Sequence, residues 1–391
     1  MSRYLSIFLL ALLLSGCGSM RSMNPVDWFA EEDNSEPPAE LVEMDSTVAT
    51  RVLWSTSISD GADEQRVKLV PFIENDRIYA ASRNGEVRAL DAATGRTLWS
   101  VDTDMEISGG PGAGEGLVLI GTSNGEVVAL DQSEGAEKWR ARVSSEVLSV
   151  PKIARGVVVV HTIDGKLFGL DAQTGTQQWL YDRSIPVLTL HGSSSPVIVG
   201  DRVICGLASG KLVMLNLQNG ELLWEITVAA PSGRSELERM VDIDGDPLVI
   251  DDLVYVVTYQ GEMAAVSIET GVVLWRRKLS SYAGMGADYS QIYVSDETDH
   301  VLAVDPGNGS ALWKNKKLQY RKLTAPVVLG GYILVGDFEG YLHFLSREDG
   351  RLEGRVRIAK SAISTQPIVI DGIVYIYADG GELAAVTTSD S

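Results

Sequence analysis

A pattern of proline, glycine and tryptophan that returns along the chain is the feature that most restricts its fold. In five stretches a proline is followed by a glycine 14 residues later, an aspartate, asparagine or serine 6 later, a glycine 4 later and a tryptophan 4 later. These stretches are 71–99, 111–139, 151–179, 196–224 and 247–275. Two later copies, 285–313 and 326–354, are incomplete, and an eighth starts at Pro367 but would reach its tryptophan position only beyond the last residue. Repeats of about 40 to 50 residues are typical of propeller blades and solenoids.

The two ends of the chain indicate how the copies are joined. Each copy contains short apolar stretches separated by glycine turns and has no sustained helical period, so we predict four antiparallel strands in each. The eighth copy lacks its last strand, whereas Trp54 stands before the first copy with no glycine turn of its own. We therefore predict an all-β fold over residues 51–391: an eight-bladed β-propeller of four-stranded antiparallel blades, its last blade closed by the strand around Trp54. An open β-solenoid is the alternative, but it leaves that strand without a role.

The repeated tryptophan is expected to have a structural role. It recurs at one position in copy after copy, whereas a stacked cofactor would need a single platform. We therefore expect each indole to pack its blade against the next. The turns have local causes as well, since the glycine of Asn84-Gly85 allows the positive φ of a tight hairpin and Asp91 offers a carboxylate to the turn that ends at Gly95.

The first residues are typical of a secreted bacterial lipoprotein. Arg3 precedes an apolar run, 5–14, of about ten residues, which is the length of a signal-peptide core and too short to span a bilayer as a helix. The run ends in Leu-Ser-Gly-Cys at 14–17, which resembles the bacterial lipobox. We therefore expect a lipoprotein signal peptide at 1–16 and lipid on Cys17. An ordinary signal peptide with a chance cysteine is the alternative.

Residues 17–50 are expected to form a lipidated, flexible tether. Gly18 follows the cysteine in place of the aspartate that retains such lipoproteins in the inner membrane, so the sorting rule predicts the periplasmic side of the outer membrane. The rest of this segment is rich in proline and acidic residues, which do not form a packed core. Lipid on Cys17 would leave Cys205 unpaired in an oxidising compartment, and we expect that thiol to be buried as a small apolar group.

The amino-acid composition excludes several classes of partner and ligand. Lys and Arg number 33 against 53 Asp and Glu, which gives a formal net charge of −20. A surface this acidic repels the phosphates of nucleic acids and of anionic lipids. We therefore expect no nucleic-acid partner, and we expect contact with the membrane only through the lipid anchor. Two cysteines are too few for a disulfide framework or a structural zinc site, and we expect neither a metal nor a cofactor.

The copies keep their internal length and vary only in the connections between them. From each tryptophan position to the next proline the gaps are 17, 12, 12, 17, 23, 10, 13 and 13 residues. In a propeller all these connections emerge on one face, and the two long internal ones, 179–196 and 224–247, are consecutive. Long connections on a rigid scaffold are where binding residues concentrate.

Both long connections carry residues suited to a protein partner. The first contains Leu188 and Leu190 followed by His191, and the second contains Asp242 and Asp244. We expect the leucines to fill an apolar groove of the partner and the aspartates to meet its Lys or Arg side chains at the rim. A solvated loop without a partner is the alternative.

A calcium-binding site is a second interpretation of the longer connection. Asp242, Asp244 and Asp246 alternate as the first acids of a calcium loop do. However, Pro247 stands where such a loop needs glycine, and Leu253 where it needs glutamate. Partner recognition is therefore the preferred interpretation.

The repeats and loops resemble known families. The Asp-x-x-Thr-Gly turn before a tryptophan, as at 91–95 and 171–175, resembles the pyrroloquinoline-quinone-type propeller repeat, and the resemblance covers nearly all of the chain after residue 50. It identifies a fold more than an activity. Together with the lipobox, the length and the two loops, it makes the sequence similar to the BamB family, lipoproteins of the bacterial outer-membrane protein assembly (BAM) machinery. That family has Leu-x-Leu and a basic residue in the first loop, and Asp-x-Asp after Glu-x-x-Arg in the second. Here Glu236 and Arg239 form the Glu-x-x-Arg that precedes the two aspartates.

The resemblance implies a non-enzymatic scaffold. Leu188, Leu190, Asp242 and Asp244 would dock on the POTRA domains of BamA, the barrel that inserts outer-membrane proteins. Other BAM components would be contacted indirectly, and unfolded outer-membrane protein substrates are a further candidate partner. His191 stands where the family commonly has arginine, so a charge-assisted contact there would be weaker at neutral pH.

Two other classes compete with this interpretation. A periplasmic quinoprotein dehydrogenase would have a similar ring with a quinone, calcium and often a disulfide between adjacent cysteines, but Cys205 has no neighbouring cysteine. The four histidines fall at unrelated positions of the repeat, with no acid–base pattern. A sensor that binds a small ligand or peptidoglycan in the central funnel is the third class.

Overall fold

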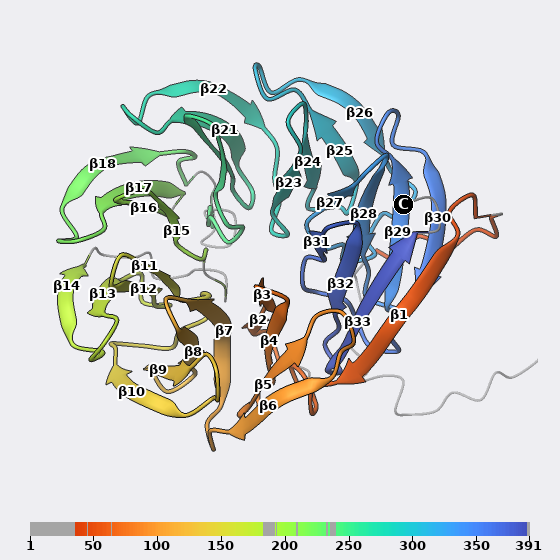
Figure 1. The fold of residues 1–391 in the computed structure, drawn as a ribbon. Coiled ribbons are helices and arrows are strands. Elements are labelled where there is room, and N and C mark those ends of the chain that lie inside the picture. The colour runs from red at the N-terminus through yellow and green to blue at the C-terminus, as the bar shows by residue number, and fades with distance from the viewer. Residues whose placement is uncertain are drawn as a thin grey trace, which may run out of the picture. The chain divides into compact units, whose positions relative to one another are not determined.

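The computed structural model describes residues 36–388 except 45, 64, 183–191, 193, 209, 232–233 and 235–239. The described chain is all-β, and its strands form eight antiparallel sheets arranged in a ring (Figure 1). The predicted eight-bladed propeller is therefore confirmed. Cys17, the signal peptide and most of the predicted tether lie outside the described residues.

Blades 1 to 7 take four strands in chain order from the centre outwards, and blade 8 takes the last three strands of the chain and then the first. Blades 1 and 2 are β3 (Phe72–Glu74), β4 (Arg77–Ala81), β5 (Glu86–Asp91), β6 (Thr97–Asp102) and β7 (Ile107–Gly114), β8 (Leu117–Thr122), β9 (Glu126–Asp131), β10 (Glu137–Arg142). Blades 3 and 4 are β11 (Lys152–Ala154), β12 (Val157–His161), β13 (Leu167–Asp171), β14 (Gln177–Tyr181) and β15 (Val197–Val199), β16 (Arg202–Leu207), β17 (Lys211–Asn216), β18 (Leu222–Thr227). Blades 5 and 6 are β19 (Leu248–Ile250), β20 (Leu253–Val257), β21 (Glu262–Ser267), β22 (Val273–Lys278) and β23 (Met285–Ala287), β24 (Ile292–Ser295), β25 (Val301–Val304), β26 (Ala311–Asn315). Blades 7 and 8 are β27 (Val327–Leu329), β28 (Tyr332–Gly336), β29 (Tyr341–Ser346), β30 (Leu352–Arg357) and β31 (Ile368–Ile370), β32 (Ile373–Tyr377), β33 (Glu382–Thr388) with β1 (Thr50–Ser57). The short strand β2 (Lys68–Leu69) joins blade 2 beside β7.

The ring closes where the two ends of the chain meet. β1 pairs antiparallel with β33, with Trp54 opposite Ala385 and Ser57 opposite Glu382. β1 is thus the outer strand of blade 8, as predicted from the unpaired repeat at Trp54 (Figure 1). The pairing leaves no open sheet edge between the first and last residues of the ring.

The tryptophans join each blade to the next one, as expected. Every indole Nε1 of the seven repeats donates to a backbone carbonyl of the following blade. The pairs are Trp54–Ala92 (3.0 Å), Trp99–Gln132 (3.2 Å), Trp139–Ala172 (2.7 Å), Trp179–Leu217 (2.8 Å), Trp224–Ile268 (2.9 Å), Trp275–Pro306 (2.8 Å) and Trp313–Arg347 (3.0 Å). The ring of each indole lies against the turn glycine of that blade: a Cβ at Gly95, where φ is +68°, would lie 2.5 Å from the Trp54 ring. Glycine is needed there for both the left-handed turn and the close approach.

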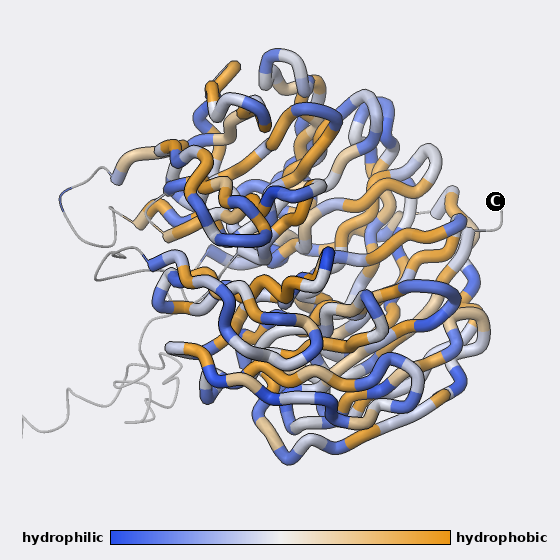
Figure 2. Tube along the Cα trace, turned by 60° about the vertical axis from the view of Figure 1, so that its left-hand side comes forward, coloured by the Kyte–Doolittle hydropathy of each residue, from blue (hydrophilic) through white to orange (hydrophobic). Residues whose placement is uncertain are grey.

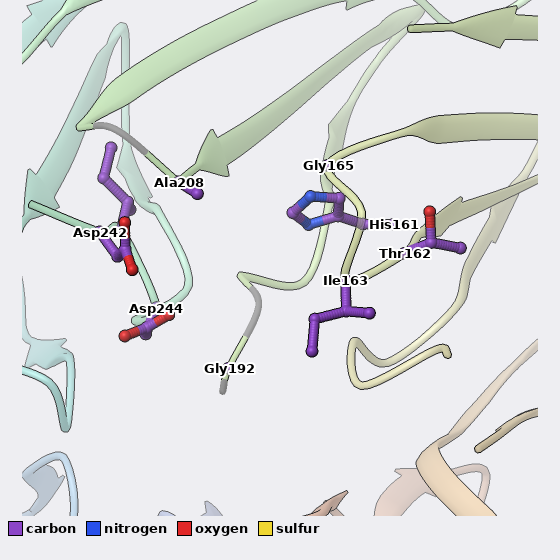
Figure 3. Close-up of a pocket in the computed structure, with 9 residues that line it drawn as sticks. His161, Thr162, Ile163, Gly165, Gly192, Ala208, Asp242 and Asp244 are labelled. Carbon is purple, nitrogen blue, oxygen red and sulfur yellow. The ribbon is translucent and has the colours of Figure 1, made fainter. Parts of the chain in front are cut away.

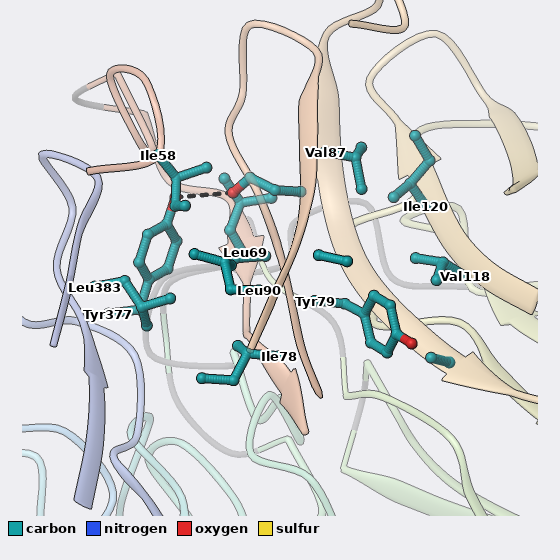
Figure 4. Packing of buried hydrophobic residues seen from close by; sticks show 14 of the residues in the cluster. Ile58, Leu69, Ile78, Tyr79, Val87, Leu90, Val118, Ile120, Tyr377 and Leu383 are labelled. Carbon is teal, nitrogen blue, oxygen red and sulfur yellow. Dashed lines mark hydrogen bonds between the residues drawn. The ribbon is translucent and has the colours of Figure 1, made fainter. Parts of the chain in front are cut away.

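The core lies between the blades. Apolar segments run along the strands, and hydrophilic residues gather at the turns (Figure 2). One cluster joins blades 8, 1 and 2 through Leu383, Ile78 and Ile120, all fully buried (Figure 4). Tyr377 of the same cluster donates a hydrogen bond of 2.9 Å from Oη to the carbonyl of Ala81. The core is therefore divided into clusters that lie between neighbouring blades, one of them spanning three blades, and the ring is stabilised by their sum.

Residues before β1 also contact the ring. Val48 is 4% exposed, and the Ala39 amide donates to the Gln319 carbonyl at 2.9 Å. These residues fall within 17–50, where the sequence predicted a tether. The packed part of the chain thus extends at least to Ala39.

Candidate functional site

The two long connections meet on one face of the ring. The first leads from β14 to β15 and the second from β18 to β19. The Ser195 amide of the first donates to Asp246 Oδ1 of the second at 2.6 Å. A Cβ at Gly192 would lie 2.9 Å from Asp244 Oδ1. The two insertions are thus packed together, as the variation in repeat length predicted.

Alternating apolar residues fix the second connection to the ring. Val241 and Ile243 are 2% and 1% exposed, and Ile243 packs so closely on Gly206 that a Cβ there would collide with it. The carbonyl of Asp242 accepts a hydrogen bond of 2.9 Å from the Tyr259 amide. The backbone that carries Asp242 and Asp244 is therefore held by blades 4 and 5.

Asp242 and Asp244 form a pair of acids in a poorly hydrated place. Asp242 is 3% exposed. The pKa of Asp244 is raised to about 7, chiefly by burial and further by the charge of Asp242, while Lys68 opposes the rise. Near neutral pH the carboxylate form of Asp244 is thus held at a cost in free energy, which is typical of functional sites.

Both acids line a small hollow opposite the hairpin that links β12 to β13 (Figure 3). Its volume is about 10 Å³, room for about one water molecule. The lining residues are His161, Thr162, Ile163, Gly165, Gly192, Ala208, Asp242, Ile243 and Asp244. A hollow of this size suits the tip of one side chain rather than a small-molecule ligand.

His161, which lines this hollow, and the neighbouring Cys205 are both held by contacts within the protein. His161 Nδ1 is 2.9 Å from the Ser194 carbonyl and 3.4 Å from Cys205 Sγ. Burial lowers the pKa of His161 and raises the pKa of the Cys205 thiol well above its usual range. Cys205 is fully buried and free, as expected, and a thiol held in its neutral form is a poor nucleophile.

A third connection, for which the sequence predicts no role, reaches the same place. The segment after β1 includes β2, which pairs parallel with β7, Lys68 lying opposite Gly109. Lys68 Nζ donates to Asp246 Oδ1 at 2.6 Å. Lys68 lies on the strand added to blade 2 and Asp246 precedes blade 5, so the ion pair joins parts of the ring that are three blades apart. The signal was the first gap of 17 residues, which is as long as the gap after Trp179.

Only part of the predicted site falls within the described chain. Asp242 and Asp244 lie there and are brought together, whereas Leu188, Leu190 and His191 lie outside the described residues, as do Glu236 and Arg239. Asp246, considered above as a calcium ligand, is engaged by Lys68 and Ser195. Across the described chain, no group of three or more His, Cys, Asp or Glu side chains is arranged to hold a metal ion.

A larger hollow of about 480 Å³ lies between blades 5 and 6. Its polar lining includes Lys278, Glu297 and Lys314, and Lys314 is paired with Asp296 at 2.8 Å. None of the residues singled out in the sequence lies in it. Within the described ranges, no helix is long and apolar enough to cross a membrane.

Comparison with known proteins gives the family. The family model described as outer membrane protein assembly factor BamB matches residues 83–315 and 297–391. The BamB of Pseudomonas aeruginosa is 49% identical over 385 residues, covering 98% of this chain and 98% of its own length. The crystal structure of BamB from Moraxella catarrhalis has a TM-score of 0.79 at 29% identity and covers 86% of this chain and 99% of that one.

Enzymes share only the architecture. A quinohemoprotein alcohol dehydrogenase from Pseudomonas putida has a TM-score of 0.68 at 14% identity, covering 88% of this chain and 76% of that one. Likeness at so low an identity shows the fold alone. Full-length identity, the family model and the solved relative agree instead on one assignment: the chain belongs to the family of the outer membrane protein assembly factor BamB.

Proposed function

We propose that this protein is a non-enzymatic scaffold of the BAM complex that assists the folding and insertion of outer-membrane proteins. Membership of the BamB family supports this role. Lipid on Cys17 would hold the protein on the periplasmic side of the outer membrane. The two long connections would dock on the POTRA domains of BamA through Leu188, Leu190, His191, Asp242 and Asp244.

The observation that carries the docking proposal is the pair Asp242 and Asp244. Burial beside a second acid disfavours the charged form of Asp244, whose pKa is about 7. A Lys or Arg side chain of a partner would favour that charged form, because an opposite charge in a site with little water interacts strongly. The pair is thus suited to a cationic side chain that arrives with a partner, and the hollow beside it admits one such tip.

The two alternative functions have less support from the site and from the comparisons. A quinoprotein dehydrogenase is supported only by the shared fold. A sensor that binds a small ligand or peptidoglycan in the central funnel has no support from the hollow that Asp242 and Asp244 line, which holds about one water molecule. Neither rival accounts for the acid pair.

Reversing the charge of both acids tests the docking face. When purified from membranes, the full-length lipoprotein with Asp242→Lys and Asp244→Lys should retain at least about tenfold less BamA than the unaltered protein. Like charges would then replace a complementary pair. Circular dichroism and thermal unfolding would confirm that the ring is folded.

The matched control changes two exposed acids in turns of other blades, Glu134→Lys and Glu348→Lys. It alters the net charge by the same amount and should leave BamA recovery unchanged. Undiminished recovery with the first pair, or equal loss with both pairs, would show that this face is not the docking site.

A further inference from the structure

One of the eight borders between blades lacks the closure that the other seven share. At seven borders an indole packs against the turn glycine of the next blade. On β30 the tryptophan position is occupied by Gly354, and Ser391 stands at the turn-glycine position of the eighth copy. The border between blades 7 and 8 therefore needs another group to fill it.

The segment before β1 lies at that position. The Thr47 amide donates to the Glu353 carbonyl at 2.8 Å, and Thr47 Oγ1 donates to Glu353 Oε2 at 2.6 Å. A Cβ at Gly354 would collide with Ser46 Oγ and would lie 3.4 Å from the Cβ of Val48. Glycine at 354 thus leaves the space that residues 46–48 occupy.

Val48 fills the border as an indole does elsewhere. It is 4% exposed and packs in one cluster with Phe344 of blade 7 and Ile376 and Val386 of blade 8. A side chain from the N-terminal segment thus contacts both blades, in the place where Trp313 contacts blades 6 and 7. The segment continues directly into β1, which closes blade 8.

A second contact holds the same segment nine residues earlier. The Ala39 amide donates to the Gln319 carbonyl at 2.9 Å, and Arg321 Nη1 donates to the Ala39 carbonyl at 2.9 Å. Arg321 is 3% exposed and is itself held by Asp337, to which it donates at 2.8 Å. Leu41 packs against the apolar cluster of blades 6 and 7. The segment is therefore fixed at two points.

We propose that residues 39–44 and 46–48 are a built-in seat: they take the place of the missing tryptophan and fix where the N-terminal part of the chain leaves the ring, beside the connection between blades 6 and 7. The seat itself stands on the contacts above. Its consequence for the membrane rests on the proposed lipid at Cys17. Twenty-one residues, 18–38, would then separate lipid and seat and span at most about 70 Å. Without the seat the 33 residues 18–50 would reach about 110 Å, so the seat shortens the reach of the ring from the membrane by about 40 Å.

Hydrogen exchange of the full-length chain tests the seat. The Thr47 amide should exchange at least about 100-fold more slowly than in an unstructured peptide, because it is hydrogen-bonded beside a buried residue. Gly354→Trp places an indole where Ser46 and Val48 lie, and the protection of Thr47 should fall at least about tenfold. The Ala385 amide on β33, opposite Trp54 of β1, reports whether blade 8 is still closed.

Leu312→Trp is the matched control, since it adds an indole at an exposed position of β26, the outer strand of blade 6, and should leave Thr47 protected. Val48→Asp is the second variant, for use if Gly354→Trp does not fold, and it should also release Thr47 by placing a charge in the border. Free exchange of Thr47 in the unaltered chain, or undiminished protection in both variants, would overturn the proposal. The measurement involves neither lipid nor BamA, so a failure of the docking proposal would leave its result unaffected.

Discussion

The borders that carry a tryptophan and the two long connections differ in how well their polar groups are stabilised. At seven borders each indole N–H has a carbonyl partner within 3.2 Å, and the ring packs on a glycine shaped to receive it. In the long connections Asp244 is half-buried beside the buried Asp242, so its charged form is disfavoured at neutral pH. The first arrangement stabilises the ring, whereas the second leaves a charge that a partner can satisfy. Regular packing therefore marks the scaffold, and a retained electrostatic cost marks the candidate docking site.

The largest expected effect comes from emptying a border. Trp179→Ala should lower the free energy of unfolding by about 3–5 kcal/mol, because it removes a buried indole and leaves a cavity against Gly220. Urea denaturation followed by tryptophan fluorescence and circular dichroism measures the change. The neighbouring Leu180, 42% exposed, provides the control, and Leu180→Ala should cost no more than about 0.5 kcal/mol. Equal effects of the two changes would contradict the role of the indole as the contact between blades.

Removing the charge of Asp244 should have the opposite sign. The folded-state pKa of about 7 lies above the ordinary value of 3.8, so the native state binds more protons than the unfolded state between these values. Stability is thus full below about pH 4 and falls as pH rises towards about 7. Asp244→Asn should remove that fall and raise stability at pH 7.5 by about 2–4 kcal/mol.

Urea titrations of the parent and Asp244→Asn at several pH values between 4 and 8 measure this difference. Asp201→Asn, at an exposed position of a turn in blade 4, is the control and should leave the pH profile as it is. A profile that does not change on Asp244→Asn would show that Asp244 is not held at a cost, and the contrast with the tryptophan borders would be lost.

The smallest expected effect comes from the ion pair that ties β2 to the second connection. Lys68 and Asp246 side chains are 25% and 42% exposed, so Lys68→Ala should cost only about 1 kcal/mol or less. Because Lys68 opposes the raised pKa of Asp244, its loss should also move the fall in stability to higher pH. Lys166→Ala removes a partly buried pair with Asp164, whose side chains are 27% and 29% exposed, and should not move that fall. Identical pH profiles of the two variants would exclude an electrostatic role for Lys68 at the site.

The fold was predictable because its information is local and repeated. The interval from proline to tryptophan sets strand lengths within a blade, and the unpaired Trp54 revealed the closure with β33. The site was predictable only in part. The variation in loop length located Asp242 and Asp244, but the pairing of Lys68 with Asp246 joins residues 178 apart and is set by the geometry of the closed ring. Likewise, Gly354 showed that a tryptophan is missing, but only the packed chain shows that Val48 replaces it.

The pairing of β1 with β33 also dictates the order of events during folding. The strand made first finds its partner only in the strand made last, more than 300 residues later. Local blades can assemble as they emerge, whereas the final contact is the most distant in the sequence and the slowest to find. Until then blade 8 exposes an unpaired edge, which is a risk of aggregation and a target for proteases. A chain truncated at either end would therefore keep most of its blades and still lack a sealed circle.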